Sequence, residues 1–312
     1  MKDTAVIFPG QGAQIVGMGA DVAQEYDAAR AVFDEADQVL GFSLSKLCFE
    51  GPAEELEKTD IQQPAIFVTS VAIWSALYGK GHTLEGYGAT GGLSLGEYTA
   101  LHLAGAFDFA SSLRLVRKRG ELMQAAAEAS PSGMVSLIGA DEESATKLCE
   151  HVAQGEVLAP ANFNCPGQIV ISGHQTACDR AVEAASEFEC RAVALPVAGA
   201  FHSPLMQPAA DELRSVLAET EISLPVIPVY ANVTANPHEG VEQIRESLAR
   251  QVTSPVLWQR CVEGMRSDGI GNFMEVGPGR VLAGMMRKIE RRMPMTSINS
   301  AESVASMAAS AS

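Results

Sequence analysis

The stretch Gly-Gly-Leu-Ser-Leu-Gly-Glu-Tyr-Thr-Ala-Leu, residues 91–101, contains the pattern Gly-x-Ser-x-Gly centred on Ser94. This pattern is typical of a nucleophile elbow, in which a sharp turn between a strand and a helix exposes a serine hydroxyl above a sheet. Small residues at 86–90 predict a weak strand before the turn, and residues 97–104 predict a helix after it. The pattern alone is a weak signal, so the rest of the chain has to decide between a nucleophile and a structural serine.

The predicted elements around the elbow favour an α/β fold. Apolar periodicity predicts a buried strand at 4–8 and helices at 17–39, 61–79 and 108–128. Further along, strands near 226–230 and 272–276 alternate with helices, so the α/β pattern continues to the end of the chain.

Between these two parts the predicted order changes to β-α-β-β-α-β, the order of a ferredoxin-like unit. We therefore expect one α/β body formed by residues 1–130 and 198–312, interrupted by a small inserted subdomain at 131–197.

Composition excludes several classes of protein. Of 312 residues, 47% are apolar and 19% charged, which is ordinary for a globular protein. The net charge of −16 argues against nucleic acid or an anionic membrane as the main partner. No run of eighteen apolar residues predicts a membrane span, and a secretory signal is not expected because the first residues already form the strand at 4–8. The six cysteines include no Cys-x-x-Cys pair, so we expect buried thiols and no zinc site.

A serine nucleophile requires a base, and six histidines are available. His202 is the best candidate because it lies in an apolar loop, residues 198–204, that ends in a proline. His102 lies eight residues beyond Ser94 on the elbow helix and should point away from the turn. The other four histidines lie in polar or loop settings or at the start of a helix. Without Ser94, a buried structural histidine would be the better interpretation of His202.

The loop Phe8-Pro9-Gly10-Gln11-Gly12 follows the first strand directly. It is not a dinucleotide fingerprint, because Ile15 stands where the last glycine would be required. Its exposed N–H groups instead suit an oxyanion hole, together with the N–H of Leu95, the residue after the nucleophile.

Taken together, these stretches resemble malonyl-CoA:acyl carrier protein transacylases and the acyltransferase domains of polyketide synthases. The resemblance extends over nearly the whole chain, and its matching stretches are 8–12, 51–56, 63–65, 92–97, 119–120, 162–164, 199–203 and 275–279. It implies an α/β-hydrolase-like body with an inserted ferredoxin-like subdomain. It also implies ping-pong transfer of a malonyl group from coenzyme A to the phosphopantetheine thiol of an acyl carrier protein, with no cofactor and no metal.

The resemblance implies a role for each matching residue. Ser94 is expected to take the malonyl group as an ester, and His202 to act first as base and then as acid. The N–H groups of Gln11 and Leu95 are expected to hold the oxyanion, and Arg119 to pair with the malonyl carboxylate. Three further residues match supporting positions: Gln251 as the residue that orients the histidine, Asn162 in the active site, and Phe201 as a bulky side chain that goes with malonyl rather than methylmalonyl.

The expected carrier protein poses an electrostatic problem, because acyl carrier proteins are generally acidic and this chain is acidic as well. Two basic stretches could form a local docking patch. The first consists of Arg287, Lys288, Arg291 and Arg292, and the second of Arg114, Arg117, Lys118 and Arg119. We expect the first to form the patch, and Arg117 and Lys118 of the second could extend it. The alternative for each stretch is a solvated helix face. We expect a monomer in a bacterial cytoplasm, or in a plastid or other organelle matrix if a transit peptide has been removed.

Leu93 departs from the resemblance, since many relatives have histidine before the nucleophile. We expect this difference to be tolerated, because the side chain before Ser94 should point away from the hydroxyl. The main alternative function is an esterase or thioesterase that uses the same Ser94 and His202, although no acid occurs at 192–201 and Gln251 is neutral. A non-catalytic scaffold is the second alternative.

Overall fold

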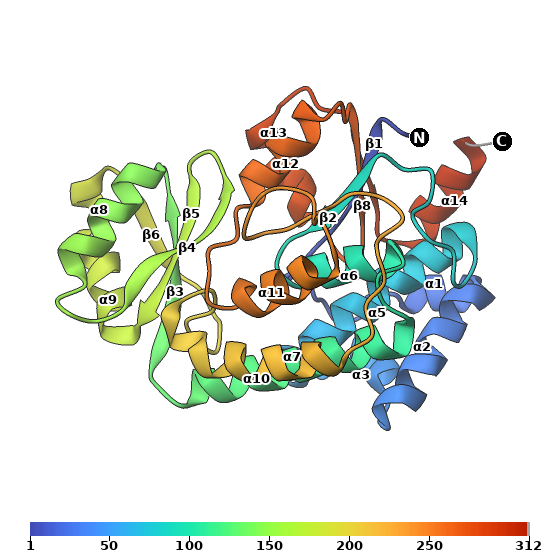
Figure 1. Ribbon diagram of the computed structural model, residues 1–312, viewed down its shortest axis with the longest axis horizontal. Helices are drawn as coiled ribbons and strands as arrows, with labels where there is room; N and C mark the ends of the chain where they lie inside the picture. The colour runs from blue at the N-terminus through green and yellow to red at the C-terminus, as the bar shows by residue number, and fades with distance from the viewer. Residues whose placement is uncertain (311–312) are drawn as a thin grey trace.

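The computed structural model describes residues 1–310 and contains two separate sheets (Figure 1). The larger sheet has five parallel strands in the order β7-β2-β1-β8-β9. Their bounds are β1 (Thr4–Phe8), β2 (Ala89–Gly92), β7 (Val229–Tyr230), β8 (Asn272–Val276) and β9 (Met295–Ile298). The expected fold class, an α/β body with a second, small sheet, is confirmed.

Helices surround the parallel sheet and form the rest of the body. They are α1 (Ala20–Glu25), α2 (Asp27–Leu40), α3 (Leu44–Glu50), α4 (Ala53–Leu56), α5 (Thr59–Tyr78), α6 (Leu95–Leu103), α7 (Phe109–Glu128), α10 (Gln207–Glu219), α11 (Val241–Gln251), α12 (Trp258–Ser267), α13 (Val281–Ile289) and α14 (Ala301–Ser310). Strand β1 shows why both faces need cover: Val6 and Phe8 pack into one apolar cluster, while Ala5 and Ile7 pack into another. No helix within residues 1–310 is long and apolar enough to cross a membrane.

The small sheet is antiparallel, with strands in the order β4-β5-β3-β6. Its elements are β3 (Ser132–Ile138), α8 (Glu142–Val152), β4 (Leu158–Cys165), β5 (Gln168–His174), α9 (Gln175–Ala184), a 3₁₀ turn (Ala185–Phe188) and β6 (Arg191–Ala194). This is the predicted β-α-β-β-α-β order. The sheet lies within the expected range 131–197, and the domain boundaries themselves stay a prediction.

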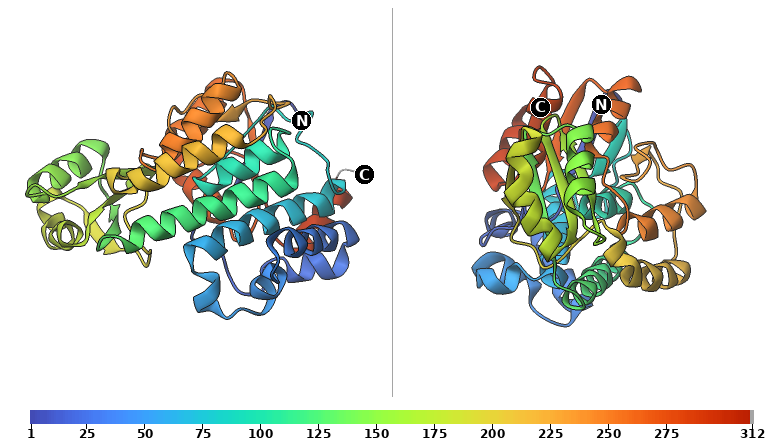
Figure 2. Two further views of the ribbon diagram at one scale, coloured as in Figure 1. Left: turned by 60° about the horizontal axis from the view of Figure 1, so that its bottom comes forward. Right: turned by 90° about the vertical axis from the view of Figure 1, so that its left-hand side faces the viewer.

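Helix α7 connects the body to the small sheet, which forms a lobe of its own (Figure 2). On the way it packs against α5 and α10. Helix α5 is buried along almost its whole length, from Thr59 to Ser75, because α2 and α7 both pack against it.

Two details differ from the sequence-based prediction. The single helix expected at 17–39 is two helices, because Tyr26 is extended (φ −123°) and separates α1 from α2. The short strand β9 and the helices α3, α4, α10 and α14 were not predicted. All six cysteines are buried.

Candidate active site

Ser94 lies in a sharp turn between β2 and α6, with backbone angles of φ 51° and ψ −101°. A non-glycine residue adopts a positive φ only when the surrounding structure holds it there. The turn directs its Oγ atom to His202 Nε2, at 2.9 Å. The predicted strand–turn–helix geometry of an elbow is therefore present.

Glycines at three positions make the elbow possible. A Cβ atom on Gly92 would come 2.1 Å from the carbonyl carbon of Gly96, and one on Gly96 would come 2.2 Å from the oxygen of Phe8. A Cβ on Gly10 would come 2.2 Å from the oxygen of Leu93. The backbones of β1, its following loop and the elbow are thus in direct contact, and no other residue fits at these positions.

The base candidate His202 is held by main-chain groups of one short segment. Its Nδ1 lies 2.8 Å from the carbonyl oxygen of Gln251, and its N–H donates to the oxygen of Val252 at 3.0 Å. Because a carbonyl can only accept, Nδ1 carries the proton and Nε2 is free to accept from the Ser94 hydroxyl. Burial and the nearby Arg119 charge lower the pKa of His202 to about 4, so the ring is neutral at pH 7.

Arg119 is buried, with 1% of its surface exposed, and it lies beside the nucleophile. Its Nη2 donates to Ser94 Oγ at 2.8 Å and to Gln251 Oε1 at 2.9 Å, and its Nη1 donates to Gln63 Oε1 at 2.5 Å. All three acceptors are neutral. Burial lowers the pKa of the guanidinium, although an arginine stays charged at neutral pH.

Packing between α5 and α7 explains how Arg119 reaches the site. A Cβ on Gly120 would come 2.8 Å from Asp60 Cα, so glycine allows the two helices to touch there. Pro64 has no N–H for the oxygen of Asp60, and Arg117 Nη1 donates to that oxygen instead, at 2.7 Å. Arg117 therefore faces Asp60 while Arg119 turns inward to Gln63.

Of the supporting residues predicted from the sequence, Gln251 contacts this centre directly. The side chain of Gln251 bridges Arg119 and the elbow, but its contact with His202 comes from the main-chain oxygen. Asn162 on β4 is 9% exposed and forms a bridge with Val256, five residues after Gln251. Phe201 is 3% exposed and packs in the main core cluster of the body.

The N–H groups expected at an oxyanion hole are those of Gln11 and Leu95. Each belongs to a residue next to the close backbone contact between Gly10 and Leu93 or directly after the nucleophile. Leu95 is the first residue of α6, where helix N–H groups have no carbonyl of their own helix to bind. Gln11 follows Gly10, whose backbone touches Leu93. The arrangement fits the prediction, and the oxyanion role stays a prediction.

Leu93 packs away from the catalytic groups. Its side chain is 9% exposed and belongs to the apolar cluster on the other face of the sheet, with Tyr230 and Trp258. A histidine here would therefore lie behind the elbow and not beside Ser94 Oγ.

Three polar residues behind the elbow were not identified from the sequence: Asn232, Glu97 and His238. Asn232 Oδ1 accepts from Ser94 N at 2.6 Å, and its Nδ2 donates to the oxygen of Gly92 at 2.8 Å. Glu97 contacts both Asn232 and His238. The available signal for Asn232 was a polar residue two positions after the predicted strand at 226–230. The signal for Glu97 was the spacing Ser94-x-x-Glu97 of a helix capping box.

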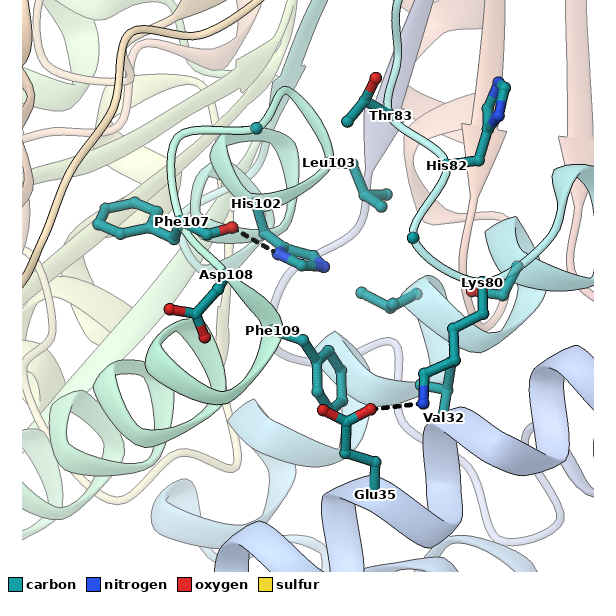
Figure 3. Close-up of a pocket in the computed structure, with 14 residues that line it drawn as sticks. Val32, Glu35, Lys80, His82, Thr83, His102, Leu103, Phe107, Asp108 and Phe109 are labelled. Atoms are coloured by element: carbon teal, nitrogen blue, oxygen red, sulfur yellow. Dashed lines mark hydrogen bonds and ion pairs between the residues drawn. The ribbon is translucent and has the colours of Figure 1, made fainter.

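A cavity of about 310 Å³ lies at the other end of α6, lined by the side chains of Figure 3. His102 lines it and its Nδ1 lies 3.0 Å from the oxygen of Phe107, while Lys80 and Glu35 pair across it. His102 thus points away from Ser94, as predicted, and this cavity is separate from the catalytic centre.

Comparison with known proteins places this geometry in a family. Residues 5–310 match the model of the acyl transferase domain. The chain belongs to the acyl transferase family. It is 42% identical over 309 residues to the malonyl CoA-acyl carrier protein transacylase of Escherichia coli K12, covering 98% of both chains. It is 40% identical over 306 residues to the Bacillus subtilis protein of the same name, covering 97% of this chain and 96% of that one.

Solved acyl transferases also share the fold. A malonyl transacylase in complex with a type II polyketide acyl carrier protein superposes with a TM-score of 0.94 at 41% identity, covering 98% of this chain and 99% of that one. The malonyl CoA-acyl carrier protein transacylase of Coxiella burnetii superposes with a TM-score of 0.93 at 37% identity, covering 98% and 96%. The resemblance stated from the sequence is confirmed.

Proposed function

We propose that this acyl transferase moves a malonyl group from malonyl-CoA to the phosphopantetheine thiol of an acyl carrier protein, through an ester on Ser94. One observation supports malonyl as the acyl group: the buried Arg119 guanidinium lies 2.8 Å from Ser94 Oγ and has only neutral acceptors. A buried cation is costly unless an anion reaches it, and malonyl has a free carboxylate one methylene from its thioester carbon. A planar guanidinium can bind that carboxylate through two parallel hydrogen bonds.

The first half-reaction uses the Ser94–His202 pair. His202 Nε2 takes the hydroxyl proton as Ser94 Oγ attacks the thioester carbon, and the N–H groups of Gln11 and Leu95 stabilise the oxyanion. The carbon–sulfur bond then breaks, and the proton passes from Nε2 to the departing sulfur of coenzyme A. The malonyl group remains as an ester on Ser94.

The second half-reaction reverses these steps with a different thiol. His202 Nε2 takes the proton of the phosphopantetheine thiol, whose sulfur attacks the ester carbon. The carbon–oxygen bond breaks and the proton returns to Ser94 Oγ. These steps require no further cofactor, and all the groups come from one chain, so a monomer suffices.

Hydrolysis is less favoured as the function of the same pair. In a hydrolase triad a carboxylate accepts from the second ring nitrogen of the histidine, whereas His202 Nδ1 faces the carbonyl oxygen of Gln251. The bacterial origin of the curated relatives supports a bacterial cytoplasm as the site of the reaction. Cell fractionation of the source organism tests that placement.

One experiment tests the function. The protein is mixed with malonyl-CoA, and mass spectrometry locates the adduct before and after addition of holo acyl carrier protein. A stable malonyl adduct on Ser94 that only the carrier protein discharges supports transfer. Rapid loss of the adduct to water would mean a hydrolase, and no adduct would mean a scaffold.

A further inference from the structure

Glu97 is a completely buried carboxylate three residues after Ser94, and none of the steps above uses it. Three donors surround it: the N–H of Asn232 at 2.9 Å and Gln251 Nε2 at 2.7 Å on Oε2, and His238 Nε2 at 3.0 Å on Oε1. A carboxylate removed from water requires such compensation. Here the donors come from two segments: Asn232 and His238 lie in the loop after β7, and Gln251 ends α11.

The contact with Asn232 connects Glu97 to the backbone of the nucleophile. In an ordinary capping box the glutamate at this position would bind the N–H of the serine three residues earlier. At the elbow the Ser94 N–H instead donates to Asn232 Oδ1 at 2.6 Å, and Glu97 binds the N–H of Asn232. The Glu97 carboxylate thus positions Asn232, and Asn232 in turn binds the backbone of Ser94 at the elbow.

The contact with Gln251 connects Glu97 to Arg119 and to the segment that holds the base. Because a carboxylate only accepts, Glu97 fixes the amide of Gln251 with its NH₂ group inward. The amide oxygen then faces Arg119 Nη2, at 2.9 Å, and the main-chain oxygen of Gln251 faces His202 Nδ1. In the flipped orientation the NH₂ group would face the guanidinium, which has no acceptor to offer it.

We propose that Glu97 is a positioning residue for acyl transfer, which through Asn232 and Gln251 aligns the elbow, Arg119 and the His202 segment. The proposal rests on the proposed function. Glu97 acts by accepting hydrogen bonds from Asn232 and Gln251, and it needs no contact with the substrate. The three donors determine which side chains can replace Glu97. The N–H of Asn232 and the NH₂ group of Gln251 both need an oxygen acceptor at position 97. His238 can instead accept a hydrogen bond, because its Nδ1 has no partner within residues 1–310 and the ring can change tautomer.

The test compares Glu97→Met, which removes both acceptors, with Glu97→Gln, which keeps an oxygen for Asn232 and Gln251 and turns its NH₂ toward His238. The rate of malonyl-enzyme formation is measured at saturating malonyl-CoA. We expect Glu97→Met to lower it at least a hundredfold with little change in half-saturation, and Glu97→Gln to recover it to within tenfold of the parent. Histidine-labelled NMR of Glu97→Gln should show the His238 proton moved from Nε2 to Nδ1.

Glu275→Met is the matched control. Glu275 is also completely buried and accepts from two N–H groups, of Leu282 and Ala283, and from the hydroxyl of Ser297, none of which belongs to the candidate active site. It should lose stability while malonyl-enzyme formation stays within threefold. If Glu97→Met does not fold, Glu97→Asp replaces it, since the shorter side chain withdraws both oxygens, and a loss of at least tenfold is expected.

Two results would overturn the proposal: a rate within threefold of the parent for Glu97→Met or its replacement, or a Glu97→Gln rate as low as that of Glu97→Met. Failure of the proposed function has a different signature, because the parent protein itself would then form no malonyl adduct on Ser94.

Discussion

Arg119 and Ser94 are hydrogen-bonded directly, with Nη2 of the arginine 2.8 Å from the hydroxyl oxygen of the serine. The group proposed to recognise the substrate thus contacts the atom proposed to attack it. A malonyl carboxylate that binds the guanidinium is therefore placed next to the nucleophile, and an acyl group without a carboxylate lacks this anchor.

Replacing Arg119 should separate malonyl from acetyl transfer. We expect Arg119→Ala to lower kcat/KM for malonyl-CoA by about two to four orders of magnitude, since losing one partner of a buried ion pair costs roughly 3–5 kcal/mol. Acetyl transfer should persist or improve. Arg117→Ala is the control: Arg117 pairs with Asp60 and not with Ser94, so the variant should leave the ratio unchanged. Equal losses for both acyl groups would refute the role of Arg119.

The pH dependence of malonyl-enzyme formation should reflect the lowered pKa of His202. Burial and the Arg119 charge favour the neutral ring, so the base is active above its pKa of about 4 and fails as the pH falls through that value. Stopped-flow rates should therefore keep their plateau well below pH 6, whereas an ordinary histidine would lose activity near pH 6.5. In Arg119→Met the acid limb should move to higher pH. An acid limb near 6.5 in the parent would contradict this.

The same shift predicts how stability depends on pH. The unfolded chain binds a proton at His202 below about pH 6.5, whereas the folded chain resists it down to about pH 4, so stability falls across this window on acidification. His202→Gln should flatten the slope of the unfolding free energy between pH 6.5 and 4 in denaturant titrations. A slope unchanged from that of the parent would mean that His202 titrates normally.

Leu93→His should have little effect on catalysis. The side chain packs in the apolar cluster that contains Tyr230 and Trp258, so we expect an imidazole there to make no contact with Ser94 Oγ. We expect malonyl-enzyme formation within tenfold of the parent and some loss of thermal stability, because a polar ring enters an apolar cluster. A hundredfold change in rate would show that the residue before the nucleophile takes part in the chemistry.

Reversing the charge of Arg287 and Lys288 should weaken docking of the carrier protein. Both are exposed near the end of α13, which packs against β4 of the small sheet. By contrast, Arg117 pairs with Asp60 and Glu121, and Lys118 also faces Glu121, so this second basic stretch is already neutralised locally. KM for the carrier protein should rise at least tenfold, while hydrolysis of the malonyl-enzyme stays constant. An unchanged KM would discard this docking patch.

Phe201 should limit the size of the acyl group. Phe201→Ser is expected to raise kcat/KM for methylmalonyl-CoA relative to malonyl-CoA at least tenfold, since the ring would no longer fill the space beside the α-carbon. Because Phe201 also packs in the core, thermal unfolding has to be measured in parallel. A parent enzyme that already uses both substrates equally well would refute this role.

The fold was predictable from the sequence where the patterns are local. The continuous apolar run of β1 and the glycines at 92 and 96 mark a buried strand and an elbow, because both are local patterns. The break at Tyr26 was not predictable, since the apolar pattern continues through it.

The sequence predicted residues that the structure brings together at the candidate active site, but not the hydrogen bonds that connect them. Ser94, His202 and Arg119 were identified from motifs, whereas the interaction of Gln251 with His202 runs through a main-chain oxygen that every residue type has. The side-chain identity at 251 therefore does not predict this bond. Asn232 and Glu97 were missed for a related reason, because their partners are 138 and 154 residues away in the chain.

The six residues 251–256 belong to both halves of the molecule. At one end Gln251 and Val252 hold His202, and at the other Val256 exchanges main-chain hydrogen bonds with Ala161 and Phe163 of the small sheet. Replacing residues 131–197 with those of a relative would thus change Ala161 and Phe163 or their surroundings, while Val256 on the other side of this contact stays the same. For chimeric enzymes the natural unit of exchange is the small sheet together with this segment, because the alignment of the base is inherited from both.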